Sequence, residues 1–112
     1  MSHSMEEWYS VKGLFRWYFI ANGETNRIEE RVLLFKALDF EHALDLAEKE
    51  AIKYCEADRE ANFRIEPVGW WRAYWLGGNP VHGAEVFSAS SITRLNSSAF
   101  LRRYYPKSHV TG

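Results

Sequence analysis

Residues 39–55 read DFEHALDLAEKEAIKYC, and this stretch decides the fold because it is the clearest amphipathic helix in the chain. Its apolar side chains recur at the three- and four-residue spacing of one helical face. They are Phe40, Ala43, Leu44, Ala47, Ala51, Tyr54 and Cys55. Asp39 is a good N-cap, because its carboxylate can accept hydrogen bonds from the unpaired N–H groups of the first turn. We therefore predict one central helix that packs a single face against a sheet.

Two strands are predicted before this helix. Residues 8–21 alternate along the chain, which places Tyr9, Val11, Phe15, Trp17 and Phe19 on one face. Gly13 interrupts that face and suggests a bulge or a close approach of backbone. Asn22 and Gly23 begin a turn, because both residue types tolerate the positive φ that a hairpin requires. Residues 27–37 then form a second strand, which should pair antiparallel with the first.

Two more strands are predicted after the helix. Residues 63–76 form the third, although Pro67 and Gly69 interrupt its start, and the Gly-Gly-Asn-Pro sequence at 77–80 ends it in a turn. Residues 81–92 form the fourth. The order strand, strand, helix, strand, strand predicts an α+β domain, with an antiparallel sheet of about four strands and the central helix on one face.

A short helix is predicted near the end of the chain. Asn96 is a suitable cap for a helix over residues 99–105, and Pro106 stops it because proline cannot continue a helix. The expected division of the chain is residues 1–7 as a disordered N-terminus or the remnant of an expression tag, residues 8–105 as a single domain, and residues 106–112 as a flexible tail.

Composition and charge exclude several classes of protein. The 112 residues are 46% hydrophobic and 26% charged, which is typical of one globular domain and not of a disordered chain. The formal net charge of −1 argues against nucleic acid as a partner, because it provides no overall attractive field. The single cysteine, Cys55, excludes an internal disulfide. No apolar run has the length of a membrane span or resembles a signal peptide, so we expect a cytoplasmic protein without a membrane partner.

Aromatic content is the unusual property of this sequence. Five Trp, six Tyr and seven Phe are more than one small core usually hides, and such side chains are enriched at protein interfaces. The predicted strands are also apolar on both faces, so the second sheet face should be covered by the C-terminal segment or by a second copy of the chain. We therefore expect a homodimer or higher homo-oligomer, or else a separate protein partner.

Four segments carry a resemblance to a known family. They are residues 8–12 (WYSVK), 29–37 (EERVLLFKA), 39–44 (DFEHAL) and 85–88 (EVFS). In this order the chain resembles the bacterial domain of unknown function 4288 family from Trp8 to Ser88. The resemblance implies a bacterial origin and a fold, and it implies no catalytic residues, because the family is functionally uncharacterised.

Residues 70–75, WWRAYW, are the segment best suited to binding. On a strand, Trp70, Arg72 and Tyr74 share one face, and together with Arg16 they form the candidate binding surface. Aromatic rings beside a guanidinium can stack on nucleobases, sugars or the apolar anchors of a partner. The commoner role of aromatic residues at this spacing is core packing on one side and a subunit interface on the other.

No catalytic, metal or cofactor site is predicted. The four histidines lack the spacing of metal ligands, and Cys55 has neither a Cys-X-X-Cys partner nor an evident activating base. We therefore predict a noncatalytic module for protein interaction or self-association. The alternative is a binder of small molecules or single-stranded nucleic acid through the aromatic and arginine side chains of residues 70–74.

Overall fold

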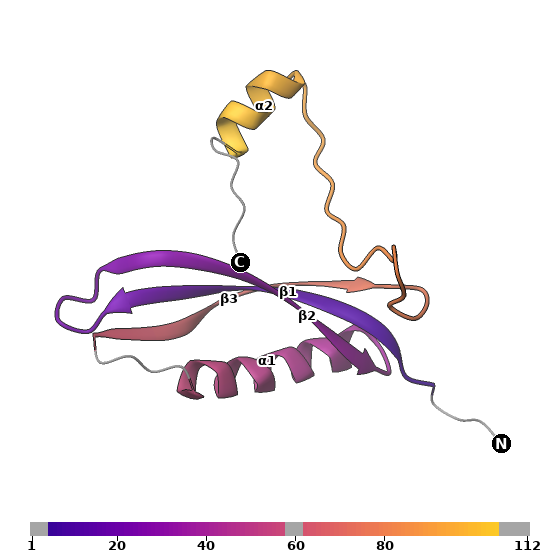
Figure 1. The fold of residues 1–112 in the computed structure, drawn as a ribbon, viewed down its shortest axis with the longest axis horizontal. Coiled ribbons are helices and arrows are strands. Elements are labelled where there is room, and N and C mark those ends of the chain that lie inside the picture. The colour runs from indigo at the N-terminus through magenta and orange to yellow at the C-terminus, as the bar shows by residue number, and fades with distance from the viewer. Residues whose placement is uncertain (1–4, 58–61, 106–112) are drawn as a thin grey trace.

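The computed structural model describes residues 5–57 and 62–105, and these residues contain three strands and two helices. They follow the order β1 (Glu7–Phe19), β2 (Thr25–Ala37), α1 (Phe40–Ala57), β3 (Phe63–Trp75) and α2 (Ser97–Tyr104) (Figure 1). The fold is α+β, as the sequence predicts.

The strands form one antiparallel sheet in the order β2-β1-β3. β1 lies in the centre, so that it pairs with another strand along both of its edges. The predicted hairpin between β1 and β2 is confirmed. Gly23 has a φ of 70°, a conformation that favours glycine, and the Asn22 side chain accepts a hydrogen bond of 2.9 Å from the backbone N–H of Glu24.

Helix α1 begins where its capping residue predicts. The Asp39 carboxylate accepts a hydrogen bond of 2.7 Å from the backbone N–H of His42. His42 in turn accepts one of 2.9 Å from the N–H of Leu38 through Nδ1, which fixes the entry of the chain into the helix. His42 is thus part of the helix cap.

The core lies between α1 and one face of the sheet. α1 buries small side chains, Ala43, Ala47 and Ala51, which allow the helix axis to approach the strands closely. The sheet contributes larger residues from odd-numbered positions, and the buried ones are Tyr9, Val11, Phe15, Trp17 and Ile65. The alternation predicted for the first strand therefore identifies the face that packs against the helix.

A bulge interrupts the pairing of β3 with β1. Gly13 lies opposite Trp71 and Phe15 lies opposite Pro67, so that residues 68–70 of β3 lie opposite Leu14 alone. Gly69 has a φ of 88° within this bulge. Pro67 and Gly69 thus distort the third strand without ending it.

The predicted fourth strand is wrong, and with it the ββαββ order and the four-stranded sheet. Residues 81–92 form no strand. The N–H of Ala84 bonds to the carbonyl of Val81 at 2.8 Å, and Gly83 has a φ of 82°, so the chain turns where a return strand would pair with β3. Residues 88–91 read Ser-Ala-Ser-Ser, and such small side chains offer little apolar area to hold a strand against a sheet.

Helix α2 is confirmed together with its cap. The Asn96 side chain accepts a hydrogen bond of 2.9 Å from the backbone N–H of Ala99. α2 contacts neither α1 nor any of the three strands, and it lies on the side of the sheet opposite α1, clear of it (Figure 1). Residues 88–96 form the extended arm that carries it. The predictions for residues 1–4 and 106–112 lie outside the described residues.

Candidate functional site: the open face of the sheet

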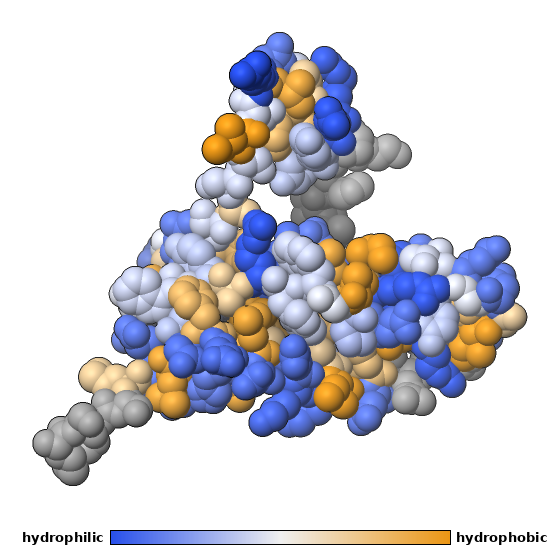
Figure 2. All heavy atoms as spheres, turned by 180° about the vertical axis from the view of Figure 1, so that it is seen from behind, coloured by the Kyte–Doolittle hydropathy of each residue, from blue (hydrophilic) through white to orange (hydrophobic). Residues whose placement is uncertain are grey.

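The face of the sheet opposite α1, called the open face below, carries the even-numbered residues of β1 and β2. Apolar side chains remain exposed on it, with Ile28, Val32 and Leu34 showing 55%, 43% and 40% of their surface to solvent. Figure 2 shows apolar residues exposed next to hydrophilic ones on the body of the molecule, and α2 standing apart from it. An exposed face of this kind is typical of a surface that meets a partner.

Two ion pairs cross the open face. Lys12 of β1 binds Glu30 of β2 at 2.6 Å, and Arg16 of β1 binds Glu66 of β3 at 2.7 Å. All four side chains are partly exposed, and such pairs typically contribute about 0–1 kcal/mol each. Their effect is to fix the positions of charges between the apolar residues of this face.

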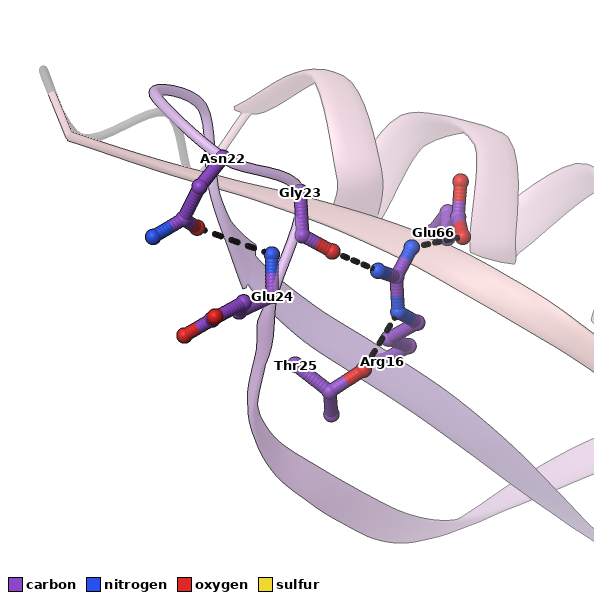
Figure 3. A network of polar contacts seen from close by, with 6 residues as sticks. All are labelled: Arg16, Asn22, Gly23, Glu24, Thr25 and Glu66. Atoms are coloured by element: carbon purple, nitrogen blue, oxygen red, sulfur yellow. Dashed lines mark hydrogen bonds and ion pairs between the residues drawn. The ribbon is translucent and has the colours of Figure 1, made fainter.

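Arg16 has a structural role within this face. Its Nε donates to the Thr25 hydroxyl at 2.6 Å, its Nη1 binds Glu66, and its Nη2 donates to the carbonyl of Gly23 (Figure 3). The guanidinium also lies 4.5 Å from the centre of the Tyr18 ring. Arg16 thus connects the β1–β2 turn to β3, and its donors are directed at the protein's own acceptors.

The other three residues of the predicted surface are only partly together. The Arg72 guanidinium lies 5.5 Å from the Trp70 ring centre, and Trp70 keeps 39% of its surface exposed. Arg72 lies opposite Lys12, four residues along β1 from Arg16, which corresponds to about 13 Å. The structure therefore brings Trp70 and Arg72 together and leaves Arg16 apart from them.

Tyr74 is covered by the segment that follows β3. Its ring lies 6.2 Å from the ring of Phe87, and Lys12 lies 5.6 Å from Phe87 on the same side. Burial raises the pKa of Tyr74, and the charge of Glu85 and a hydrogen bond to it raise this pKa further. Glu85 and Phe87 belong to the predicted fourth strand, whereas the C-terminal segment, as far as residue 105, does not cover the open face as predicted, because α2 contacts no strand.

A polar cluster between β2 and α1 was not found from the sequence. Glu29 accepts hydrogen bonds from the Tyr54 hydroxyl at 2.6 Å and from Trp17 Nε1 at 3.3 Å. The Arg31 guanidinium lies 3.5 Å from the centre of the Tyr54 ring, and within the described residues its buried Nη1 has no hydrogen-bond acceptor. The only signal in the sequence is that Glu29 and Arg31 alternate in phase with the inward-facing residues of β2.

Cys55 lies beside this cluster. Burial raises the pKa of its thiol, and the positive charge of Arg31 opposes that effect only in part. The thiol is therefore protonated at neutral pH and packs against the core as a small apolar side chain.

The described part of the chain has open hollows but no cluster of metal ligands. One open hollow of about 520 Å³ lies between the arm and α2, where Thr93, Leu95 and Leu101 contribute to its lining. No group of three or more His, Cys, Asp or Glu side chains within residues 5–57 and 62–105 is placed to hold a metal ion. None of the helices in those ranges has the length and apolar character needed to span a bilayer.

Comparison of the chain with protein-family models, with curated proteins and with solved structures finds no match. The resemblance of residues 8–88 to the bacterial family described above therefore remains a prediction.

Proposed function

We propose that this protein is a noncatalytic domain that binds protein through its open face, and that its first partner is a second copy of itself. The observation that carries this proposal is the row of exposed apolar residues Ile28, Val32 and Leu34 on a regular strand. The lone Cys55 supports a reducing compartment such as the bacterial cytosol.

The energetic reason lies in the apolar area that remains in water. Fully burying a side chain such as Val or Leu contributes about 1.5–3 kcal/mol. In the single chain, 43% of the surface of Val32 and 40% of that of Leu34 remain exposed to solvent. Covering both therefore contributes about 1.2–2.5 kcal/mol in each copy. A two-fold dimer doubles this contribution, because the same patch is buried on both subunits.

A second candidate function rests on the exposed pair of Trp70 and Arg72. A nucleobase or sugar could stack on this pair, as expected for a binder of nucleotides or single-stranded nucleic acid. This function is less favoured, because Tyr74 is covered by Phe87 and the donors of Arg16 bind within the protein. Quenching of tryptophan fluorescence by an oligonucleotide that disappears in Trp70→Leu would favour this second function.

Analytical ultracentrifugation over a hundredfold range of concentration tests the main proposal. We expect the unmodified protein to associate, and we expect Val32→Ser combined with Leu34→Ser to weaken the association at least about tenfold. Ile52→Ser is the matched control, because Ile52 is equally apolar and 58% exposed but lies on α1. A protein that stays monomeric at every concentration would contradict the proposal.

A further inference from the structure

The two edges of the sheet differ in how well they are protected. β3 contains Pro67, which has no N–H to donate, and the bulge at residues 68–70 distorts that edge further. β2 also has 13 residues, but it contains neither proline nor glycine, and among the described strands it pairs with β1 alone (Figure 1). An edge strand of this length and regularity is a template for another strand.

The charged residues of β2 are spaced so that they can pair with charges of opposite sign on a second copy of β2. When two copies of one strand pair antiparallel about a two-fold axis, opposed residues lie at equal distances on either side of the residue at the axis. With Leu33 at the axis, Glu30 lies opposite Lys36 of the second copy, and Val32 lies opposite Leu34 of the second copy. Opposite charges and apolar side chains directly opposed across strands both stabilise the pairing.

Neighbouring registers lack this match. An axis at Glu30 places two Glu30 carboxylates opposite each other, and an axis at Arg31 opposes two guanidinium groups. An axis at Val32 places Glu30 opposite Leu34. Axes at Val32 and Leu34 oppose no charges of either sign. Among the axes from Glu30 to Leu34, only the one at Leu33 therefore opposes unlike charges without also opposing like ones, which makes it the most favourable of them.

We propose that β2 pairs antiparallel with β2 of a second copy about a two-fold axis at Leu33, which joins two three-stranded sheets into one of six strands. This inference rests on the proposed self-association and places its contact at the edge of β2, where Val32 and Leu34 of the two copies lie side by side on the joined open face.

The surroundings of both charges suit this contact. Glu30 binds Lys12 on its inner side, yet 61% of its side chain is exposed, so its carboxylate can also accept from Lys36 of the second copy. Lys36 lies 5.5 Å from the centre of the Trp8 ring. In the dimer the exposed parts of Val32 and Leu34 from both copies form one apolar strip along the centre of the joined open face.

A charge exchange tests the register. We expect Lys36→Glu to weaken the dimer at least about tenfold, because the new carboxylate at position 36 then faces Glu30 of the other copy. The double variant Glu30→Lys with Lys36→Glu restores opposite charges and should recover the affinity to within about threefold. Lys53→Glu on the exposed side of α1 makes the same change in net charge and should have no effect. The unfolding midpoint of each variant separates a lost contact from a lost fold.

Cysteine cross-linking provides a second measurement at the axis. In a Cys55→Ala background, Leu33→Cys should form a disulfide-linked dimer on mild oxidation, because opposed Cα atoms in antiparallel strands lie about 4.5–5.5 Å apart. Ile28→Cys is the control and should not cross-link, since the two copies of residue 28 lie about ten positions apart along the paired strands, roughly 33 Å.

The possible outcomes separate the two proposals. A dimer that is unaffected by Lys36→Glu, or that cross-links at residue 28 and not at residue 33, would overturn the edge pairing and leave self-association in place. A monomeric unmodified protein would overturn both. Loss of the dimer in Lys36→Glu with recovery in the double variant would support the pairing of β2 with itself.

Discussion

Gly13 is the residue at which the packing of the sheet is most sensitive. A Cβ atom built on Gly13 would lie 2.5 Å from Cζ3 and 2.8 Å from Cε3 of the Trp71 side chain. The Trp71 ring therefore crosses the space that a side chain at residue 13 would fill, and there it packs edge-on against Phe15 at 6.1 Å. The sequence predicts a close approach at Gly13, but it does not identify Trp71 as the residue that makes it.

We expect Gly13→Ala to lower the free energy of unfolding by about 1–3 kcal/mol, because the large Trp71 ring must move within a packed core. Urea denaturation followed by tryptophan fluorescence measures the change. Gly78→Ala is the control, since a Cβ there would meet no atom within 4 Å, and its unfolding free energy should change by no more than about 0.5 kcal/mol. Equal effects of both substitutions would contradict this account.

Cys55 should make stability depend on pH above the neutral range. Burial raises the pKa of its thiol in the folded protein, so at alkaline pH the unfolded chain loses this proton before the folded chain does. Stability is then fully present below the ordinary cysteine pKa, about 8.5, and decreases as the pH rises through the raised value.

The measurement is urea denaturation of the unmodified protein and of Cys55→Ala at a pH of about 7.5, 8.5 and 9.5 under reducing conditions, which brackets the ordinary thiol pKa. The unfolding free energy of the unmodified protein should fall more steeply with pH than that of the variant. Parallel curves for the two proteins would show that the thiol does not titrate differently in the folded state.

At the scale of elements, the sequence correctly predicts the features that depend on residues close together in the chain. The cap at Asp39, the turn at Asn22 and Gly23, and the helix after Asn96 are all confirmed, because each depends on hydrogen bonds within a few residues. The predicted fourth strand is wrong, because a segment forms a strand only where a neighbouring strand can pair with it. Pairing with β3 depends on the distorted edge of β3 as well as on the small side chains of residues 88–91, and the first of these conditions lies outside residues 81–92.

For the candidate binding surface too, the sequence predicts what depends on neighbouring residues and misses the contacts between distant ones. Alternation along one strand correctly places Trp70 and Arg72 on one face, since this needs only the period of a strand. The partner of Arg16 is Glu66, 50 residues further along the chain, and the segment that covers Tyr74 follows β3 through an irregular turn. These contacts depend on the register between strands, which the sequence alone does not specify.

Helix α2 should depend on its cap more than most helices do. It has no contact with the other elements, so its stability comes from its own hydrogen bonds and from the side chain of Asn96. Asn96→Ala should destabilise the helix by about 0.5–2 kcal/mol, which is enough to unfold an isolated helix of eight residues.

The ¹³Cα chemical shifts of Ala99 and Phe100 report the helix directly and should move toward random-coil values in Asn96→Ala. Ser97→Ala, one residue further along, is the control, because it leaves the capping side chain in place. The urea midpoint of the sheet should not change in either variant. Helical shifts that persist without the cap would mean that α2 is stabilised by contacts beyond those described.

The whole molecule is larger than a compact chain of its length. Its radius of gyration is 17.2 Å, whereas a compact domain of 112 residues has one of about 13 Å. The arm and α2 contribute to the excess, since they extend away from the sheet (Figure 1). The surplus of aromatic residues is partly explained in the same way, because Tyr104 and Tyr105 lie at the end of this arm with 54% and 63% of their surface exposed.

Truncation after Ser90 should leave the sheet and α1 folded. The deletion removes the outer part of the arm and α2 but keeps Glu85 and Phe87 against Tyr74. We expect the thermal midpoint to change by less than about 4 °C, because no core contact is lost. Circular dichroism at the same protein concentration measures it, and a cooperative transition shifted well beyond this range would contradict an undocked arm.

In the proposed dimer, the bulge in β3 would also limit how far the assembly can grow. Joining two copies through β2 leaves β3 as the outer strand on both sides, and each of these strands carries Pro67 and a distorted ladder. A third copy then finds no regular edge to extend, so addition stops at a closed pair and does not continue into a fibril. Pro67 and Gly69, which interrupt the pairing of β3, would thus prevent a sheet with an exposed apolar face from polymerising.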